Sequence, residues 1–481
     1  MEAAARAFPV FPTIPIRGAG LVLACGSVAA ALVLVVGTTA VVAVFGIGVL
    51  AGLFLKPRAG AHLVLGVAIA LDPGGFGFFH LFADPFWKLP PSVADALPLK
   101  TNPFELLVAW LAVVVTVRGI RAASPGLPGL VWLVPCILFS GLAWGAMNGG
   151  DVALAYHEAR GLIFATLAFY VLIRVGPPKE ETLTRAAFVV FASLACATIL
   201  RWVLYLRGGA VPLEHWFDHE TGLFLALGFV VACVAALQAK TPSGRAAAVG
   251  LALLTLVAVA MTGRRSAILG VGAGVLIVGW LVMPKRPALL VGLAVPALLV
   301  MAGYLSVYWE GHTGPLAEPA RAVRSQVDPD ARDRSSDEYR TIERENVQRT
   351  LRGTPLFGVG FGNPYEQFEK LPTLALWPLQ FHTPHQNLLW LWLKMGIVGA
   401  AVLVGLWITA FRRCVIACRS AAAGSLPAVP LCLAAGLLMA LTYARVDMAF
   451  VGSRSAVFCA VLLALAFQFV GRDGRPQEGP Q

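Results

Sequence analysis

The chain has 481 residues, of which 58% are hydrophobic and 13% are charged, about half the charged fraction of an ordinary soluble domain. Its length would suit three soluble domains. However, the mean hydropathy is +0.77, and the charged residues are too few to cover the surfaces of such domains. These values disfavour a soluble enzyme, a nucleic-acid-binding module and a disordered scaffold, so the net charge of +11 has to be understood from where the basic residues lie relative to a membrane.

Apolar runs of near membrane-spanning length follow one another along the chain. They begin near Leu21, Thr38, His62, Phe104, Gly129, Gly161, Ala186, Thr221, Ala246, Ser266, Pro287, Asn387, Leu426 and Val451. A helical span needs about 20 mostly apolar residues, and the runs at His62 and Phe104 are short. The sequence therefore predicts an all-α polytopic membrane protein with about 12–14 transmembrane helices.

Lys and Arg residues are unevenly shared between alternate short loops. If the N-terminus is cytoplasmic, the cytoplasmic loops hold 18 Lys and Arg residues and the opposite short loops hold 8. Cytoplasmic loops of membrane proteins carry an excess of these residues. We therefore expect a multi-pass protein of the inner (plasma) membrane, in contact with the lipid bilayer, with both termini cytoplasmic and without a nucleic-acid partner.

One polar segment interrupts the apolar pattern. It divides the chain into an N-terminal transmembrane bundle over 1–308, a large extracytoplasmic (periplasmic) loop over 309–386, C-terminal spans over 387–471 and a cytoplasmic tail over 472–481. The loop holds nine Lys and Arg residues, and long loops are exempt from the positive-inside rule. It is either a solvated cap or an anion-binding site beside the membrane. We favour the second because Arg binds phosphate bidentately.

The loop contains a predicted helix. Ser335 and Ser336 are expected to cap its start, and Gly353 is expected to end it. Arg340 and Arg344 are four residues apart on this helix and share a face.

A glycine-rich turn follows the predicted helix over residues 355–363. Gly358 and Gly360 in this turn permit tight backbone turns and the close approach of a ligand. Arg349 and Arg352, near the end of the helix, are interpreted as ordinary surface residues.

The loop ends on a His-Thr-Pro-His-Gln-Asn run that passes directly into the next apolar run. His382, His385 and Asn387 thus lie at the entry of a span, on the same side as the loop arginines. Arg264 and Arg265 occupy a short turn between two other spans on this side. Neutral imidazole can accept a proton near neutral pH, whereas Arg is always charged. These residues offer a base and several fixed cations, which suits transfer from a donor with a phosphate leaving group.

The spacing of these features is specific. Arg340 stands fifteen residues before Pro355, His385 stands eleven residues before Gly396, and an Arg-Arg-Ser-Ala turn covers residues 264–267. In this order, and on one side of the membrane, they resemble the motifs of the O-antigen ligase and O-antigen polymerase family. Members of this family are bacterial membrane glycosyltransferases of the GT-C type.

The resemblance extends over about residues 245–410 and places the arginine of the family's short turn on Arg265. The sequence departs from the family pattern at Gln386, where the family usually has Asn, and the Asn comes one residue later at Asn387. It also departs at Arg344, where the family often has an aromatic residue.

The resemblance implies a GT-C-like fold and a transferase that needs neither a metal nor another cofactor. Such an enzyme moves a glycan from an undecaprenyl-diphosphate carrier to an acceptor hydroxyl, in lipopolysaccharide or surface polysaccharide biosynthesis. The acceptor is a sugar of lipid A core in ligases, another lipid-linked repeat in polymerases and a protein in related enzymes. His385 would be the general base, and Arg265 and Arg340 would hold the diphosphate. The remaining candidates for contact with substrate are Arg264, Arg344, His382, Asn387, Gly358 and Gly360.

The rival class is a transporter, such as a lipid-linked glycan flippase. Charges deep in the spans would mark its path, but the clearest two, Arg201 and Lys394, are expected to reach an interface. The polar residues instead cluster at one outer surface, which favours the transferase. Asp218 and Glu220 are the nearest candidates for a metal site, and we interpret them as a rim feature that contacts sugar.

Overall fold

The computed structural model describes residues 38–71, 86–89, 101–121, 127–208, 219–310, 317–373, 379–422 and 425–471, and its regular elements there are helices. Before the polar segment come α2 (Thr38–Leu55), α3 (Pro57–Ala70), α6 (Pro103–Val117), the short 3-10 helix η2 (Gly129–Trp132), α7 (Leu133–Met147), α8 (Val152–Val175), α9 (Glu180–Gly208), α10 (His219–Gln238), α11 (Pro242–Met261), α12 (Arg265–Val282) and α13 (Pro287–Tyr308). The polar segment contains α14 (Glu318–Arg324) and α15 (Ala331–Gly353), and α16 (Asn387–Ser420), α17 (Ala428–Val446) and α18 (Ser453–Phe469) follow it.

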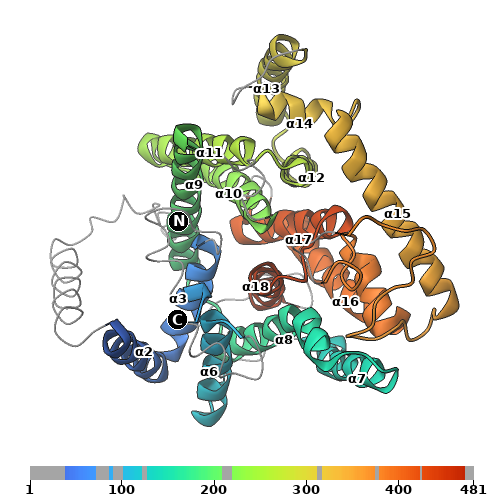
Figure 1. Cartoon of the computed structure of the whole chain (residues 1–481). Coiled ribbons are helices and arrows are strands. Elements are labelled where there is room, and N and C mark those ends of the chain that lie inside the picture. Colours follow the sequence, from blue (N-terminus) through green and yellow to red (C-terminus); the bar gives the residue numbers. More distant parts are fainter. Residues whose placement is uncertain are drawn as a thin grey trace.

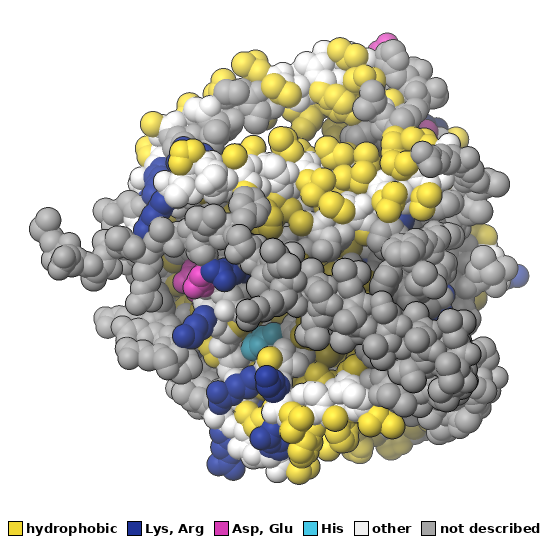
Figure 2. All heavy atoms as spheres, turned by 90° about the vertical axis from the view of Figure 1, so that its left-hand side faces the viewer, with side chains coloured by type: hydrophobic (Ala, Val, Ile, Leu, Met, Phe, Trp, Pro, Cys, Tyr) yellow, Lys and Arg dark blue, Asp and Glu magenta, His cyan; other side chains and the backbone are white. Residues whose placement is uncertain are grey.

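The described helices are those of a polytopic membrane protein. Seven of them are long and apolar enough to cross a membrane, and five shorter apolar helices accompany them. Each apolar run expected from Thr38 onward coincides with a helix, while the run at Leu21 and the tail over 472–481 lie outside the described residues. On the face shown in Figure 2, hydrophobic side chains cover much of the described surface and most visible Lys and Arg side chains gather toward its left-hand edge.

The helices of the C-terminal spans form the centre of the bundle. In Figure 1, α18 lies in the middle of the molecule, with α3, α8, α16 and α17 around it; it packs along α8, while α17 packs against α12 and α16. The small residues Ala434, Ala435 and Ala440 of α17 are fully buried, which lets neighbouring helices approach closely, as is usual inside membranes.

Helix α15 begins earlier than the sequence indicated. It starts at Ala331, and the side chain of Asp330 caps it by accepting a hydrogen bond from the Asp333 N–H at 2.8 Å. The expected start at Ser335 and Ser336 is therefore wrong, because an Asp cap five residues upstream already satisfies the first turn. Figure 1 shows α15 running along the outside of α16 and α17.

Helix α16 is interrupted at Gly396, which has φ +70° and ψ 176° inside the helix. The backbone N–H of Ile397 donates instead to the carbonyl of Leu356 in the glycine-rich turn, at 3.2 Å. A Cβ at Gly396 would lie 2.0 Å from that carbonyl oxygen. Glycine is thus required here, and the break fixes the glycine-rich turn against the span that begins beside His385.

Candidate active site

His385, at the entry of α16, is held by Glu343 of α15. Its Nδ1 lies 3.0 Å from Oε2 of Glu343, and its backbone N–H donates to the same oxygen at 2.8 Å. Glu343 is only 1% exposed, so the carboxylate depends on these donors. A carboxylate at Nδ1 makes that nitrogen the donor and Nε2 the basic nitrogen. This is the arrangement of a general base oriented by an acid.

Tyr339 supports the imidazole from one turn earlier on α15. The two rings lie edge to face, with centroids 5.9 Å apart. The Tyr339 hydroxyl accepts a hydrogen bond from Nε2 of Gln380 at 2.9 Å, and burial raises the pKa of Tyr339. The phenol therefore stays neutral at physiological pH and leaves the Glu343 carboxylate as the charged neighbour of the histidine.

Arg265, the first residue of α12, is bound within the protein. Its Nη1 and Nη2 donate to the two carboxylate oxygens of Asp337 at 2.9 and 2.7 Å. Asp337, on α15, has a side chain that is 44% exposed. The Asp337 carboxylate makes the two-point contact with Arg265 that a phosphate would make. An anion therefore reaches Arg265 by displacing Asp337 or by sharing the guanidinium with it. Arg264 precedes it at the N-cap of α12 and is half-buried.

Arg340 lies on α15 between these two contacts, three residues after Asp337 and three before Glu343. Its Nε is buried and has no hydrogen-bond partner in the described part of the chain. A buried cationic donor without a partner is costly, so Arg340 suits a site that an anionic ligand completes. Helix α15 thus brings the three predicted residues Arg265, Arg340 and His385 into one site.

A polar cavity of about 420 Å³ lies between α15, the start of α16 and the end of α17. It is lined by Arg344, Glu345 and Gln348 of α15, by Gln386, Leu388 and Leu389 at the start of α16, and by Arg445 of α17. Arg344 follows Glu343 directly in the chain, and Gln386 follows His385. The cavity therefore lies beside the base.

Asn387 has a structural role. It is fully buried, and its Oδ1 accepts a hydrogen bond from the Phe450 N–H at 2.6 Å, which ties α16 to the segment before α18.

His382 lies near the charged side chains of Lys394 and Asp151. Its Nδ1 is buried without a hydrogen-bond partner in the described residues. Burial and the charge of Lys394 lower the pKa of His382 to about 4, although Asp151 opposes the shift. The side chain is therefore neutral at physiological pH.

The glycine-rich turn approaches the chain's own backbone. Gly358 has φ +66°, and a Cβ there would lie 2.1 Å from the Leu393 carbonyl oxygen. Gly360 has φ +82°, and its Cβ would lie 2.4 Å from the backbone of Gly145 in α7. The close approach that these two glycines permit is therefore to α16 and α7, which gives them a structural role.

A buried ion pair fastens the same turn. Nζ of Lys394 lies 2.8 Å from Oε1 of Glu158 on α8, and both side chains are fully buried. Lys394 also donates to the Asn363 carbonyl, and Glu158 accepts the N–H of Gly362. Arg201, the other charge within a predicted span, is also buried, at 2% exposed, so neither side chain reaches solvent.

A family model described as O-antigen ligase matches residues 250–404. This part of the chain is therefore similar to an O-antigen ligase-like family. A comparison with curated proteins gives no match. The part that matches this O-antigen ligase-like family contains Arg265, Arg340, Glu343 and His385, whereas Arg445 of the polar cavity lies beyond it.

Glu343 stands outside the motifs that indicated the other site residues, although the sequence contains a signal for its role. Tyr339, Val347 and Leu351 mark the inward face of α15, eight and then four residues apart, and Glu343 fills the position midway between the first two. A lone carboxylate on the buried face of an otherwise apolar stripe needs a donor from a neighbouring segment. Its partner, His385, could not be identified from helix periodicity.

Glu220 is not a rim residue in this O-antigen ligase-like protein. It is 8% exposed and accepts a hydrogen bond from the Ser455 hydroxyl, so its interpretation as a surface contact for sugar is wrong. It is buried because the chain at Gly452 packs directly on its carboxylate. Asp218 lies outside the described residues. Among the residues that the structure describes, no group of three or more His, Cys, Asp and Glu side chains could hold a metal.

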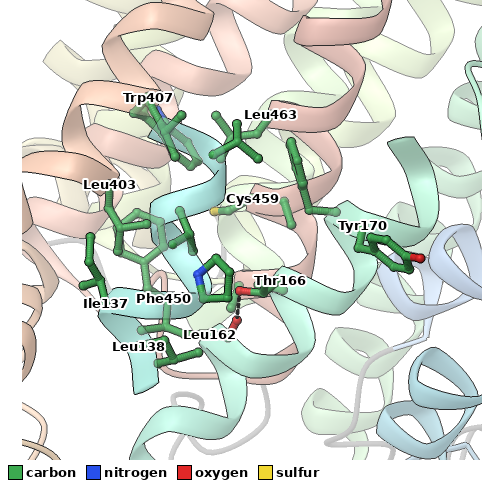
Figure 3. Close-up of a pocket in the computed structure, with 18 of the residues that line it drawn as sticks. Ile137, Leu138, Leu162, Thr166, Tyr170, Leu403, Trp407, Phe450, Cys459 and Leu463 are labelled. Atoms are coloured by element: carbon green, nitrogen blue, oxygen red, sulfur yellow. Dashed lines mark hydrogen bonds between the residues drawn. The ribbon is translucent and has the colours of Figure 1, made fainter. Parts of the chain in front are cut away.

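A second cavity, of about 240 Å³, lies inside the bundle between α7, α8, α16 and α18. Figure 3 shows apolar side chains such as Leu138, Leu403 and Phe450 around it. The hydroxyl of Thr166 is satisfied by the carbonyl of Leu162 at 2.8 Å. Its lining is almost entirely apolar and includes no His, Asp, Glu or Lys, so the candidate active site is the polar one.

Proposed function

We propose that this O-antigen ligase-like protein is a membrane glycosyltransferase that moves a glycan from an undecaprenyl-diphosphate carrier to an acceptor hydroxyl. The observation that supports the proposal most strongly is the Glu343–His385 pair. Glu343 lies within one helical turn of Arg340, whose buried Nε has no hydrogen-bond partner among the described residues. A fixed base and a fixed cation are what such a transfer requires.

In the proposed reaction, Nε2 of His385 takes the proton of the acceptor hydroxyl as its oxygen forms a bond to the anomeric carbon of the donor sugar. The bond between that carbon and the diphosphate oxygen breaks, and its electron pair leaves with the lipid diphosphate. Arg340 stabilises the charge that develops on the leaving group. Glu343 stabilises the imidazolium that forms, because its carboxylate lies at Nδ1.

Arg265 would join the leaving-group site only when the donor arrives. In the structure its guanidinium binds Asp337, and a diphosphate carries more charge than one carboxylate. Displacement of the half-exposed Asp337 by a phosphate would bring Arg265 and Arg340 to the same anion.

We further propose that this chemistry takes place on the periplasmic side of the inner membrane, with both termini in the cytoplasm. The excess of Lys and Arg in alternate short loops supports this orientation. Labelling of single cysteines should place Asp328 outside the cytoplasm and Arg412 inside. A cytoplasmic Asp328 would contradict the orientation and, with it, the side assigned to the site.

The leaving-group role of Arg340 is tested with purified protein and a polyprenyl-diphosphate-linked donor. Arg340→Ala should weaken donor binding and slow transfer together, and Arg340→Lys should rescue only in part, because an ammonium lacks the planar two-point contact. Arg352→Ala is the control, since Arg352 is exposed on the same helix. Equal and small effects of both alanine variants would indicate a diffuse basic surface and contradict the proposal.

The alternative within the same family is an O-antigen or exopolysaccharide polymerase, because the donor chemistry is shared. Deletion separates the two reactions. Loss of polymer from lipid A core with retention of long carrier-linked chains identifies a ligase, whereas loss of the long chains themselves identifies a polymerase.

The flippase alternative is less well supported. The buried Lys394 is paired with Glu158 at the glycine-rich turn, and this gives the charge a role in the fold.

A further inference from the structure

The polar cavity beside His385 contains two guanidinium groups that the proposed reaction does not use. Arg344 and Arg445 both line it, both are exposed, and neither makes an ion pair in the described part of the chain. They come from α15 and from the last turn of α17, two elements far apart in the sequence. Two cations that face one cavity without a partner favour an anionic ligand there.

The rest of the lining indicates what carries the negative charge. Gln348 and Gln386 offer amide donors and acceptors, and Glu345 offers a carboxylate acceptor. Leu388 and Leu389 supply an apolar edge. The volume of about 420 Å³ falls in the range of small-molecule sites. Amides, a carboxylate and a short apolar edge suit a hydroxyl-rich ring, so the lining as a whole suits a sugar that bears an acidic group.

The position along α15 assigns this sugar to one of the two substrates. Arg340 precedes Glu343 by three residues, or about 4.5 Å of helix rise, whereas the α15 residues of the cavity, Arg344 to Gln348, follow it by one to five residues, or about 1.5 to 7.5 Å. The proposed leaving-group site and the polar cavity therefore lie on opposite sides of the Glu343–His385 pair along the helix. A base that removes the acceptor proton has to stand between the acceptor and the donor.

We propose that the polar cavity binds an acidic sugar of the acceptor, with Arg344 and Arg445 holding its carboxylate or phosphate group. This assignment to the acceptor rests on the proposed function. Arg445 determines acceptor specificity by selecting a charged sugar over its neutral counterpart. Arg344 supplies the second point of contact beside the base.

The test is a binding measurement that needs no turnover. Saturation-transfer NMR on the purified protein compares glucuronic acid and glucose 6-phosphate with neutral glucose. At least one acidic sugar should bind roughly tenfold more tightly than glucose, since charge-assisted contacts are about twice as strong as neutral ones; the better of the two shows which anionic group the cavity prefers. Equal binding of all three sugars would overturn the proposal.

Variants of Arg344 and Arg445 test whether the acidic sugar binds in the polar cavity. Arg344→Ala and Arg445→Ala should each lower the affinity for the acidic sugar about tenfold, while Arg352→Ala should leave it unchanged. Arg445→Lys keeps a cation at the C-terminus of α17, where a charge also stabilises the helix, but it should still lose most of the affinity. Full affinity in Arg445→Lys or in Arg445→Ala would contradict the two-point contact.

Inorganic pyrophosphate serves as the probe for the leaving-group side. Its binding should depend on Arg340 and remain unchanged in Arg445→Ala. The reverse dependence would place the donor in the polar cavity and overturn the assignment to the acceptor. In transfer assays, Arg445→Ala should raise the KM for the acceptor and leave the KM for the donor unchanged. A protein that binds the acidic sugar at Arg445 but transfers no glycan would contradict the proposed function alone.

Discussion

The Glu158–Lys394 and Glu343–His385 pairs each join a glutamate to a basic side chain, and they differ in their surroundings. Glu158 and Lys394 are both fully buried, and their partners are the backbone of the glycine-rich turn. In the second pair, Glu343 is also buried, but the side chain of His385 is 15% exposed, and the next residue, Gln386, lines the polar cavity.

The difference shows which pair is available for chemistry. A buried ion pair whose remaining atoms bind backbone groups stabilises one arrangement of three segments, here α8, α16 and the glycine-rich turn. A pair in which one member is partly exposed can exchange a proton with a ligand. The two pairs are linked, because the turn fixed by Glu158 and Lys394 directly follows α15, which carries Glu343.

The largest expected effect separates the two pairs by activity. His385→Ala should lower turnover by roughly 10²–10⁴-fold, the usual contribution of a positioned base, while the affinity for the donor and the thermal unfolding temperature stay close to those of the wild type. Steady-state transfer rates and a thermal unfolding curve measure the two quantities. A variant that loses its fold together with its activity would make His385 a structural residue.

The second effect is on stability. Lys394→Met leaves the Glu158 carboxylate buried without its cation, which should cost about 3–5 kcal/mol of folding free energy. Adding Glu158→Gln should recover part of the loss, because the amide oxygen can still accept the Gly362 N–H and no unpaired charge remains. Unfolding in detergent measures both variants. A fully stable Lys394→Met protein would refute the structural role of the pair.

A smaller effect is a pH dependence of stability beside the buried pair. Burial and the charge of Lys394 hold the pKa of His382 at about 4, below the value of about 6.5 for an unperturbed histidine. The unfolded chain therefore binds the proton more readily, and stability should fall as the pH drops from about 6.5 toward 4 and be independent of His382 above that range.

His382→Gln should have a shallower loss of unfolding temperature between pH 6.5 and 4.5 than the wild type. Identical slopes in the two proteins would show that His382 is not shielded from protons by the fold.

The smallest expected effect is that of metal chelation on the transfer rate, which should not change. If the cations that stabilise the leaving group are arginines, EDTA should leave the transfer rate unchanged. Loss of activity on chelation, with recovery on addition of Mg²⁺ or Mn²⁺, would contradict the role of Arg340 as the leaving-group cation and require a metal site.

Much of the helical framework could be predicted from the sequence, because the physics that specifies it is local. Apolar runs of spanning length mark the helices, and Gly353 marks the end of α15. The start of α15 could not be placed reliably, because Asp330 and the two serines are all good caps and only the packed structure chooses between them.

The candidate site was predicted less completely, because its key contacts join distant segments. The motif spacing indicated Arg265, Arg340 and His385. The spacing did not reveal that Asp337 binds the guanidinium of Arg265 or that Glu343 orients His385. Nor did it reveal that Gly358 contacts the backbone of α16. Each of these contacts depends on how α15 and the following turn lie against α12 and α16.

The measurement that tests the central claim most directly is a double-mutant cycle on turnover with Glu343→Gln and His385→Ala. Glu343→Gln keeps an acceptor for the His385 backbone N–H but removes the carboxylate that orients the ring, so it should slow transfer about tenfold or more. If Glu343 acts through His385, the double variant should be no slower than His385→Ala alone. Two effects that multiply in the double variant would show that Glu343 acts independently, and would contradict the assignment of Glu343 and His385 as one acid–base pair.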